Sequence, residues 1–121
     1  MHNEPVQIEL YTDKNGNMDL LDDMPIKDQR KFVQKNEDFT KRTLQQFLRS
    51  KDINPIVGFK NYYEIKYWFS SPPYRGISII RKQLVVILSV FKGSGSGGAL
   101  KKYISKAINR AQDWLSRNQQ P

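Results

Sequence analysis

The apolar positions along the chain follow two periods, and the changes of period predict the order of the elements. VQIELYT (6–12) alternates apolar and polar side chains, which indicates a strand. Between residues 25 and 50 apolar side chains recur at helical spacing, so we expect one helix, or two if QKNED (34–38) bends the chain. The helix ends before Pro55, because proline disfavours helix at the residue that precedes it.

Three strand-like runs and a last helix complete the pattern. The runs are YYEIKYWF (62–69), YRGISII (74–80) and LVVILSVF (84–91). The third run is nearly all apolar, as in a central strand buried on both faces, and the short connections imply antiparallel neighbours. ALKKYISKAINRAQDWL (99–115) has one apolar stripe and predicts a helix, after which 116–121 form a flexible tail. We therefore expect one domain over residues 1–121, with antiparallel neighbouring strands and the element order β-α(-α)-β-β-β-α.

The charge is basic overall and unevenly distributed. The formal net charge is +8, yet residues 1–23 carry six acidic side chains and one basic side chain, Lys14. Residues 59–121 carry eleven basic side chains and two acidic ones, Glu64 and Asp113. A basic C-terminal half indicates a polyanionic partner, nucleic acid first, with a solvated surface or an acidic partner protein as the alternatives.

The composition excludes several kinds of chemistry. The chain has no cysteine, which rules out disulfides and thiolate catalysis and fits a cytoplasmic location. No secretory leader and no membrane-length apolar run is visible. The single histidine is His2, and the acids Asp19, Asp22 and Asp23 lack the spacing of a calcium loop, so we expect no metal and no cofactor.

The run FKGSGSGGALKK (91–102) has the glycine content of a phosphate-binding loop. It lacks the Gly-Lys-Ser/Thr ending of a nucleoside triphosphate loop and the parallel βαβ context of a dinucleotide site. We therefore read the Gly-Ser stretch 93–98 as a natural loop or an engineered linker, with its basic flanks as the chemically relevant part.

Basic and aromatic residues are the remaining candidates for a functional site. If the three strands form a meander, Lys66 and Arg75 lie on neighbouring strands, and Lys92 lies where the glycine loop begins. Such a cluster suits RNA phosphates. Stacking faces for bases would come from Tyr63, Tyr67, Trp68 or Phe91. Each of these residues taken alone is more typical of an ordinary strand or core position.

The sequence resembles the RelE/ParE toxin superfamily over most of its length, roughly residues 7–112. The resemblance depends on the Tyr-Arg step at 74–75, the apolar strand that ends in Phe-Lys at 91–92 and the helix KKYISKAINRA. The opening IELYTDKNGN is similar to the HigB-like, phage-associated branch of type II toxin-antitoxin systems. The Gly-Ser loop departs from that branch, which commonly has a Lys/Thr/Gln-rich segment here.

The resemblance implies a compact α+β fold with helices packed against a small antiparallel sheet. It also implies a metal-free endoribonuclease that cuts mRNA in the ribosomal A site. In such enzymes the 2′-hydroxyl of the mRNA attacks the adjacent phosphate, and basic residues stabilise the transition state. Arg75 would contact the scissile phosphate, Lys66 would assist proton transfer, and Lys92 is the basic residue that ends the last strand. Further RNA contacts are expected from Arg81, Lys82, Lys101, Lys102 and Tyr103.

The resemblance also implies partners and leaves alternatives open. The expected partners are mRNA on the ribosome and a cognate antitoxin, a helix-turn-helix protein of the HigA-like kind whose acidic segment covers the cationic site. The alternative is a binder of the same fold without nuclease activity, which inhibits gyrase or binds RNA or protein. A phage or mobile-element protein that keeps the fold without toxicity is the third possibility.

Overall fold

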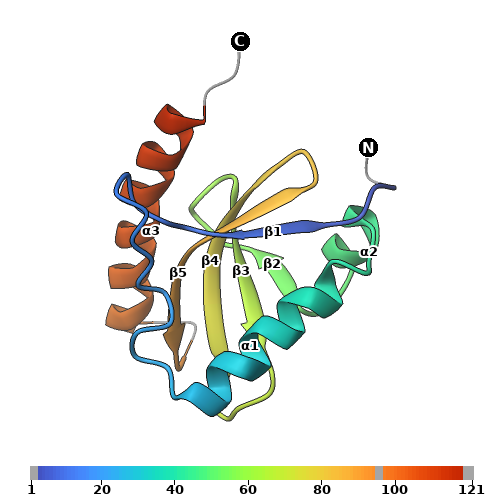
Figure 1. Ribbon diagram of the computed structural model, residues 1–121, viewed down its shortest axis with the longest axis horizontal. Coiled ribbons are helices and arrows are strands. Elements are labelled where there is room, and N and C mark those ends of the chain that lie inside the picture. Colours follow the sequence, from blue (N-terminus) through green and yellow to red (C-terminus); the bar gives the residue numbers. More distant parts are fainter. Residues whose placement is uncertain (1–2, 95–96, 119–121) are drawn as a thin grey trace.

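The computed structural model describes residues 3–94 and 97–118 (Figure 1). His2, Gly95, Ser96 and the last three residues of the expected tail (119–121) lie outside this part. The strands are β1 (Gln7–Leu10), β2 (Ile53–Pro55), β3 (Tyr62–Tyr67), β4 (Tyr74–Arg81) and β5 (Leu84–Lys92). The helices are α1 (Ile26–Phe39), α2 (Leu44–Leu48) and α3 (Gly97–Arg117).

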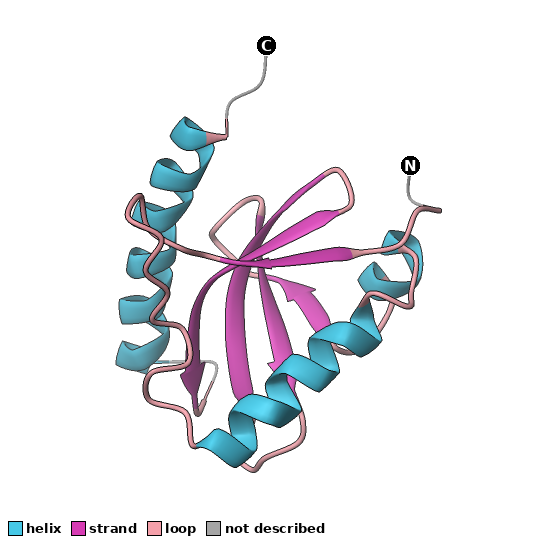
Figure 2. Ribbon diagram, viewed as in Figure 1, coloured by secondary structure: helices cyan, strands magenta, loops and turns pink. Residues whose placement is uncertain are grey.

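The strands form one twisted sheet in the order β1-β5-β4-β3-β2 (Figure 2). The expected antiparallel meander of β3, β4 and β5 is confirmed. The expectation of a wholly antiparallel sheet is wrong, because β1 pairs parallel with β5 from Gln7 opposite Leu84 to Leu10 opposite Ile87. The chain is therefore an α+β protein with a mixed five-stranded sheet, and β5 is an interior strand, as its apolar sequence predicts.

Two local features differ from the sequence prediction. The chain forms two helices here, one of the two expected arrangements, but the break comes after Phe39 and not at residues 34–38. Helix α2 begins behind a capping box in which Thr43 and Gln46 bind each other's backbone N–H groups. Residues 53–55 form β2 at the edge of the sheet, antiparallel to β3. Proline is tolerated there because an edge strand leaves one row of backbone groups unpaired.

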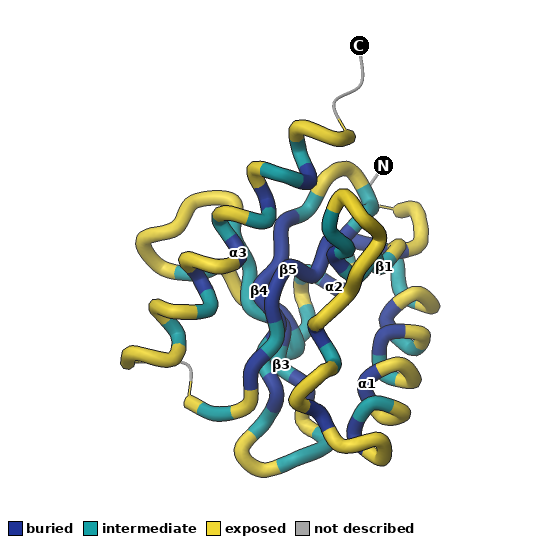
Figure 3. Tube along the Cα trace, turned by 60° about the vertical axis from the view of Figure 1, so that its left-hand side comes forward, coloured by how far each residue is buried: buried dark blue, intermediate teal, exposed yellow. Residues whose placement is uncertain are grey.

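Helices bury both faces of the sheet, which produces two apolar cores (Figure 3). On one face, Phe32 and Phe39 of α1 and Phe47 of α2 pack against β3 and β5. On the other face, Ile104, Ala107, Ala111 and Trp114 of α3 pack against β4 and β5. None of the helices in the described residues is long and apolar enough to cross a membrane.

Two buried tyrosines attach α1 to the sheet. The Tyr67 hydroxyl donates to Asn36 Oδ1 at 2.8 Å, and the Tyr74 hydroxyl donates to Asp28 Oδ2 at 2.7 Å. Burial, reinforced by the Asp28 carboxylate, raises the pKa of Tyr74 to about 12. Because Asp28 and Asn36 lie about two helical turns apart along α1, the two bonds fix how the helix lies across the ends of β3 and β4.

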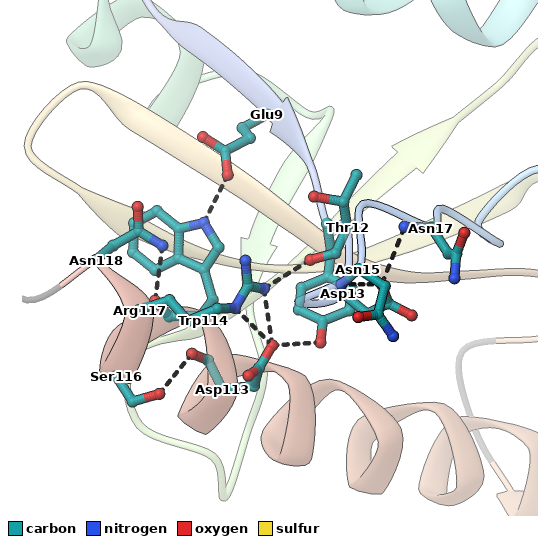
Figure 4. A network of polar contacts seen from close by, with 11 residues as sticks. Glu9, Thr12, Asp13, Asn15, Asn17, Asp113, Trp114, Ser116, Arg117 and Asn118 are labelled. Atoms are coloured by element: carbon teal, nitrogen blue, oxygen red, sulfur yellow. Dashed lines mark hydrogen bonds and ion pairs between the residues drawn. The ribbon is translucent and has the colours of Figure 1, made fainter.

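A polar network attaches the C-terminal end of α3 to the segment that follows β1 (Figure 4). Asp113 accepts hydrogen bonds from the Tyr11 hydroxyl at 2.6 Å and from Arg117, which also donates to the Thr12 carbonyl. Trp114 Nε1 donates to Glu9 Oε2 at 2.6 Å. The hydrogen bonds from Arg117 and Tyr11 hold the pKa of Asp113 below its usual value. The last turns of α3 are thus held against the N-terminal segment.

Replacement of Tyr74 by phenylalanine should destabilise the protein because Asp28, a carboxylate only 8% exposed, loses its hydrogen-bond donor. We expect the free energy of unfolding to fall by about 1–3 kcal/mol at neutral pH. The raised pKa of Tyr74 contributes stability that is complete below its ordinary value of 10.0 and is lost as pH rises toward 12. The difference in unfolding free energy between the wild type and Tyr74→Phe should therefore narrow as the pH rises from 10 toward 12.

Urea unfolding from neutral pH through this alkaline range measures that difference. Tyr62→Phe provides a matched control, because it removes a tyrosine hydroxyl from the neighbouring strand at a half-buried position. Equal losses of stability at neutral pH for the two substitutions would contradict the role given to the Tyr74–Asp28 bond.

Candidate functional site

The strand register brings two of the candidate residues, Lys66 and Arg75, together at one end of the sheet, on the face that α3 partly covers. Lys66 of β3 lies directly opposite Arg75 of β4, and Arg75 lies opposite Phe91 of β5. Residues that face each other across a ladder point to the same side of the sheet. The prediction that Lys66 and Arg75 lie on neighbouring strands is confirmed, and their side chains share one face.

Arg75 is the most firmly held basic side chain of this group. Its Nη1 donates to Glu64 Oε1 at 2.7 Å, and its Nε donates to the Gly93 carbonyl at 2.7 Å. The exposed fractions of the Arg75 and Glu64 side chains are 14% and 12%. The bonds of Arg75 with described residues use two of the five N–H donors of a guanidinium, so within this part of the chain the group is fixed in orientation and retains donor capacity for an anion.

Glu64 is a site residue that sequence reasoning missed. It lies two positions before Lys66 on β3, and alternation along a strand puts both side chains on one face. The strand sequence YYEIKYWF contains the signal, an acid and a base separated by one apolar residue. Which arginine pairs with Glu64 depends on the register between β3 and β4. The sequence of β3 alone does not contain that register.

Gly93 connects the glycine loop to this group. Its N–H donates to the Pro73 carbonyl, and its own carbonyl accepts from Arg75. Its φ of 138° is a backbone conformation that residues other than glycine rarely adopt. In the part of the loop that the structure describes, the glycine thus positions a backbone carbonyl against Arg75 and does not form a phosphate cradle.

Lys66 and Trp68 form the outer part of the same surface. The Lys66 ammonium lies 5.6 Å from the centroid of the Trp68 ring, within the range of a cation–π contact. Trp68 follows β3 directly, and 56% of it is exposed. We call Glu64, Lys66, Trp68 and Arg75 the cationic face, since the two basic side chains outnumber the single acid.

Lys92 does not belong to the cationic face. It pairs with Tyr74, one position beyond the pair of Arg75 and Phe91, and therefore points to the opposite side of the sheet. Its ammonium lies 5.5 Å from the centroid of the Tyr74 ring. The expected cluster of Lys66, Arg75 and Lys92 is thus divided between two faces.

Lys92 instead lines a cleft of about 140 Å³ beside the part of β5 that β1 does not cover. Lys106 and Arg110 of α3 also line this cleft, and both form ion pairs with Asp19. These contacts, led by the hydrogen bonds from Arg110, lower the pKa of Asp19. The ion pairs of Asp19 attach the segment before α1 to α3. Among the described residues, no group of three potential metal ligands occurs.

The remaining candidates for RNA contact lie in two places, the hairpin between β4 and β5 and the first turns of α3. Arg81 and Lys82 lie at the hairpin between β4 and β5, six residues or roughly 20 Å along the strand from Arg75, so they do not join the cationic face. Lys101 and Lys102 are exposed in the first turns of α3. The Tyr103 ring stacks on Phe91, with centroids 4.8 Å apart and an interplanar angle of 12°. This contact makes Tyr103 part of the packing between α3 and β5.

The architecture and the site define an α+β protein with a fixed arginine–glutamate pair, a lysine and an exposed tryptophan on one end of its sheet. In comparisons with known proteins, the sequence matches no protein-family model and has no significant match among curated proteins.

The contact between Glu64 and Arg75 should be strongly coupled in energy. Glu64→Ala leaves a largely buried guanidinium without its charged acceptor, so we expect the free energy of unfolding to fall by about 1–3 kcal/mol. Glu64→Ala, Arg75→Ala and the double variant form a double-mutant cycle by urea denaturation. The double variant should lose less than the sum of the two single losses.

The exposed pair of Asp38 and Lys41 gives a matched cycle elsewhere on the surface. Its side chains are 44% and 77% exposed and 3.8 Å apart, so its coupling should be close to zero. If the Glu64–Arg75 coupling were no larger than this value, the pair would not hold Arg75 in place.

Proposed function

We propose that this protein is the toxin of a type II toxin-antitoxin system of the RelE/ParE kind, of the HigB-like branch, which acts in the cytoplasm as a ribosome-dependent mRNA endoribonuclease. The observation that carries the proposal is the cross-strand pair of Lys66 and Arg75 on a partly open sheet face. The basic C-terminal half of the chain supports a nucleic-acid partner.

The reaction would be an internal transfer at phosphorus. The 2′-hydroxyl oxygen of one nucleotide attacks the adjacent phosphorus, and the bond from phosphorus to the 5′ oxygen breaks. The products are a 2′,3′-cyclic phosphate on one fragment and a 5′-hydroxyl on the other. Extra negative charge gathers on the phosphoryl oxygens in the transition state, so correctly aligned cations supply much of the catalysis.

Arg75 is the residue assigned to the phosphate. A guanidinium suits this task because its planar N–H groups match the spacing of two phosphoryl oxygens. The bonds that Arg75 donates to Glu64 and to the Gly93 carbonyl fix the plane of its guanidinium before substrate binds, so little reorganisation of this group is needed during the reaction.

Glu64 and Lys66 are the titratable groups beside Arg75 on β3. In this proposal the Glu64 carboxylate accepts the proton of the 2′-hydroxyl, and the Lys66 ammonium donates a proton to the departing 5′ oxygen. Both transfers need a group within hydrogen-bond reach of the reacting oxygen. Glu64 has the additional role of positioning Arg75.

The proposed partner besides the ribosome is a cognate antitoxin of the helix-turn-helix, HigA-like kind. A disordered acidic segment of such a protein would cover the cationic face and compete with RNA phosphates. The complementary charge would also speed the association of the two proteins.

A binder of the same fold without nuclease activity is the second candidate. The observation in its favour is the burial of the Glu64–Arg75 pair, in which the arginine charge is already balanced by a carboxylate. The Gly-Ser content of the loop after β5 also favours it, because such side chains offer little to RNA. Such a protein would inhibit gyrase or bind RNA or protein without cutting.

Cleavage of mRNA on programmed ribosomes tests the proposal. Wild-type protein should cut the message at codon-spaced positions, and Arg75→Ala should lower the rate by about 10²–10³-fold, the usual loss when one group that stabilises an anionic transition state is removed. Arg81→Ala is the matched control, since it removes an arginine from the far end of the same strand and should leave the rate unchanged.

Two outcomes would contradict the proposal. Equal activity of the Arg75→Ala and Arg81→Ala proteins would remove the role of Arg75. Intact mRNA together with blocked DNA supercoiling in a gyrase assay would establish the second candidate instead.

A further inference from the structure

Trp68 is the most exposed ring among the aromatic residues of the sheet region that could face RNA. Tyr67 is completely buried, and Phe91 is 5% exposed and stacked on Tyr103. Tyr63 is half-buried and packs against the core beneath α1. Of the four rings that the sequence offered for stacking, only Trp68, at 56%, has most of its surface open.

Trp68 lies beside the two basic side chains of the cationic face. The Lys66 ammonium contacts its ring at 5.6 Å, and Lys66 in turn lies opposite Arg75. Trp68 lies in the turn directly after β3, and the contact of its ring with Lys66 places it at the outer edge of the cationic face. A phosphate-binding cation beside an open aromatic ring is the arrangement with which proteins hold unpaired nucleotides.

We infer that Trp68 stacks on an unpaired base of single-stranded RNA whose backbone phosphates contact Lys66 and Arg75. The inference rests on the proposed function for the choice of RNA and adds the residue that holds the base. Stacking is tolerant of base identity because every base has an aromatic face. Trp68 should therefore contribute affinity and placement of the strand, with little preference among sequences.

Binding of short RNA oligonucleotides tests this inference without a ribosome. Labelled single-stranded RNA is titrated with protein and followed by fluorescence anisotropy, beside an oligonucleotide of the same length and charge whose central positions lack bases. Trp68→Leu should weaken binding of the intact RNA by about 5- to 100-fold and leave binding of the abasic strand unchanged. Trp68→Phe should restore most of the loss, since a phenyl ring also stacks.

Two controls separate stacking from folding and from general loss of an aromatic ring. Circular dichroism should show the same fold and melting for Trp68→Leu, because the ring is mostly exposed. Phe59→Leu removes another exposed ring, in the loop between β2 and β3 at the opposite end of β3, and should not change RNA affinity.

Intrinsic fluorescence gives a second readout. The chain has two tryptophans, and Trp114 is 6% exposed with its Nε1 bound to Glu9. RNA should therefore quench part of the wild-type emission, that of Trp68. In Trp68→Leu, where Trp114 is the remaining tryptophan, RNA should leave the emission unchanged.

The outcomes distinguish this inference from the proposed function. Equal RNA affinity of the wild type and Trp68→Leu, unquenched wild-type fluorescence, or no RNA binding at all would overturn the inference and would indicate a protein contact for Trp68. RNA binding that weakens in Trp68→Leu only when the oligonucleotide carries bases, together with no cleavage of mRNA on ribosomes, would support the inference and contradict the proposed nuclease activity.

Discussion

The cross-strand register of β3, β4 and β5 is the constraint on which the candidate site depends. It aligns Lys66, Arg75 and Phe91 in one row across three strands. The same row brings Arg75 within hydrogen-bond distance of Glu64 and of the backbone that leaves β5. A shift of any strand by one residue would turn these side chains to the opposite face, and the cationic face would not exist.

The two apolar cores explain why the site lies where it does. Helices α1 and α2 bury one face of the sheet, and α3 packs on β4 and β5 of the other. The outer end of β3 on the α3 side therefore remains accessible, and Lys66 and Trp68 lie there. The burial of the Arg75 and Glu64 side chains strengthens their mutual attraction, because water screens the charges less than at an open surface.

Much of the fold could be predicted from the sequence, because β3, β4, β5 and α3 have clear periods and short connections. The parallel pairing of β1 and the short edge strand β2 could not, since both depend on contacts between distant segments. The site was predicted in part. A bulge between Ile77 and Ser78 inserts Leu88 into the ladder and moves Lys92 from the face of Arg75 to the opposite one. Alternation within a strand contains no sign of such a bulge.

The chemical ends of the cleaved message test the central claim most directly, because they report which bond was broken and by which nucleophile. Messenger RNA cut on programmed ribosomes by the wild-type protein should carry a 2′,3′-cyclic phosphate on the upstream fragment and a 5′-hydroxyl on the downstream one. A message with a 2′-deoxynucleotide at the cut position should stay intact. Fragments with a 3′-hydroxyl and a 5′-phosphate, or cleavage of the deoxy-substituted message, would contradict the mechanism built on Arg75, Lys66 and Glu64.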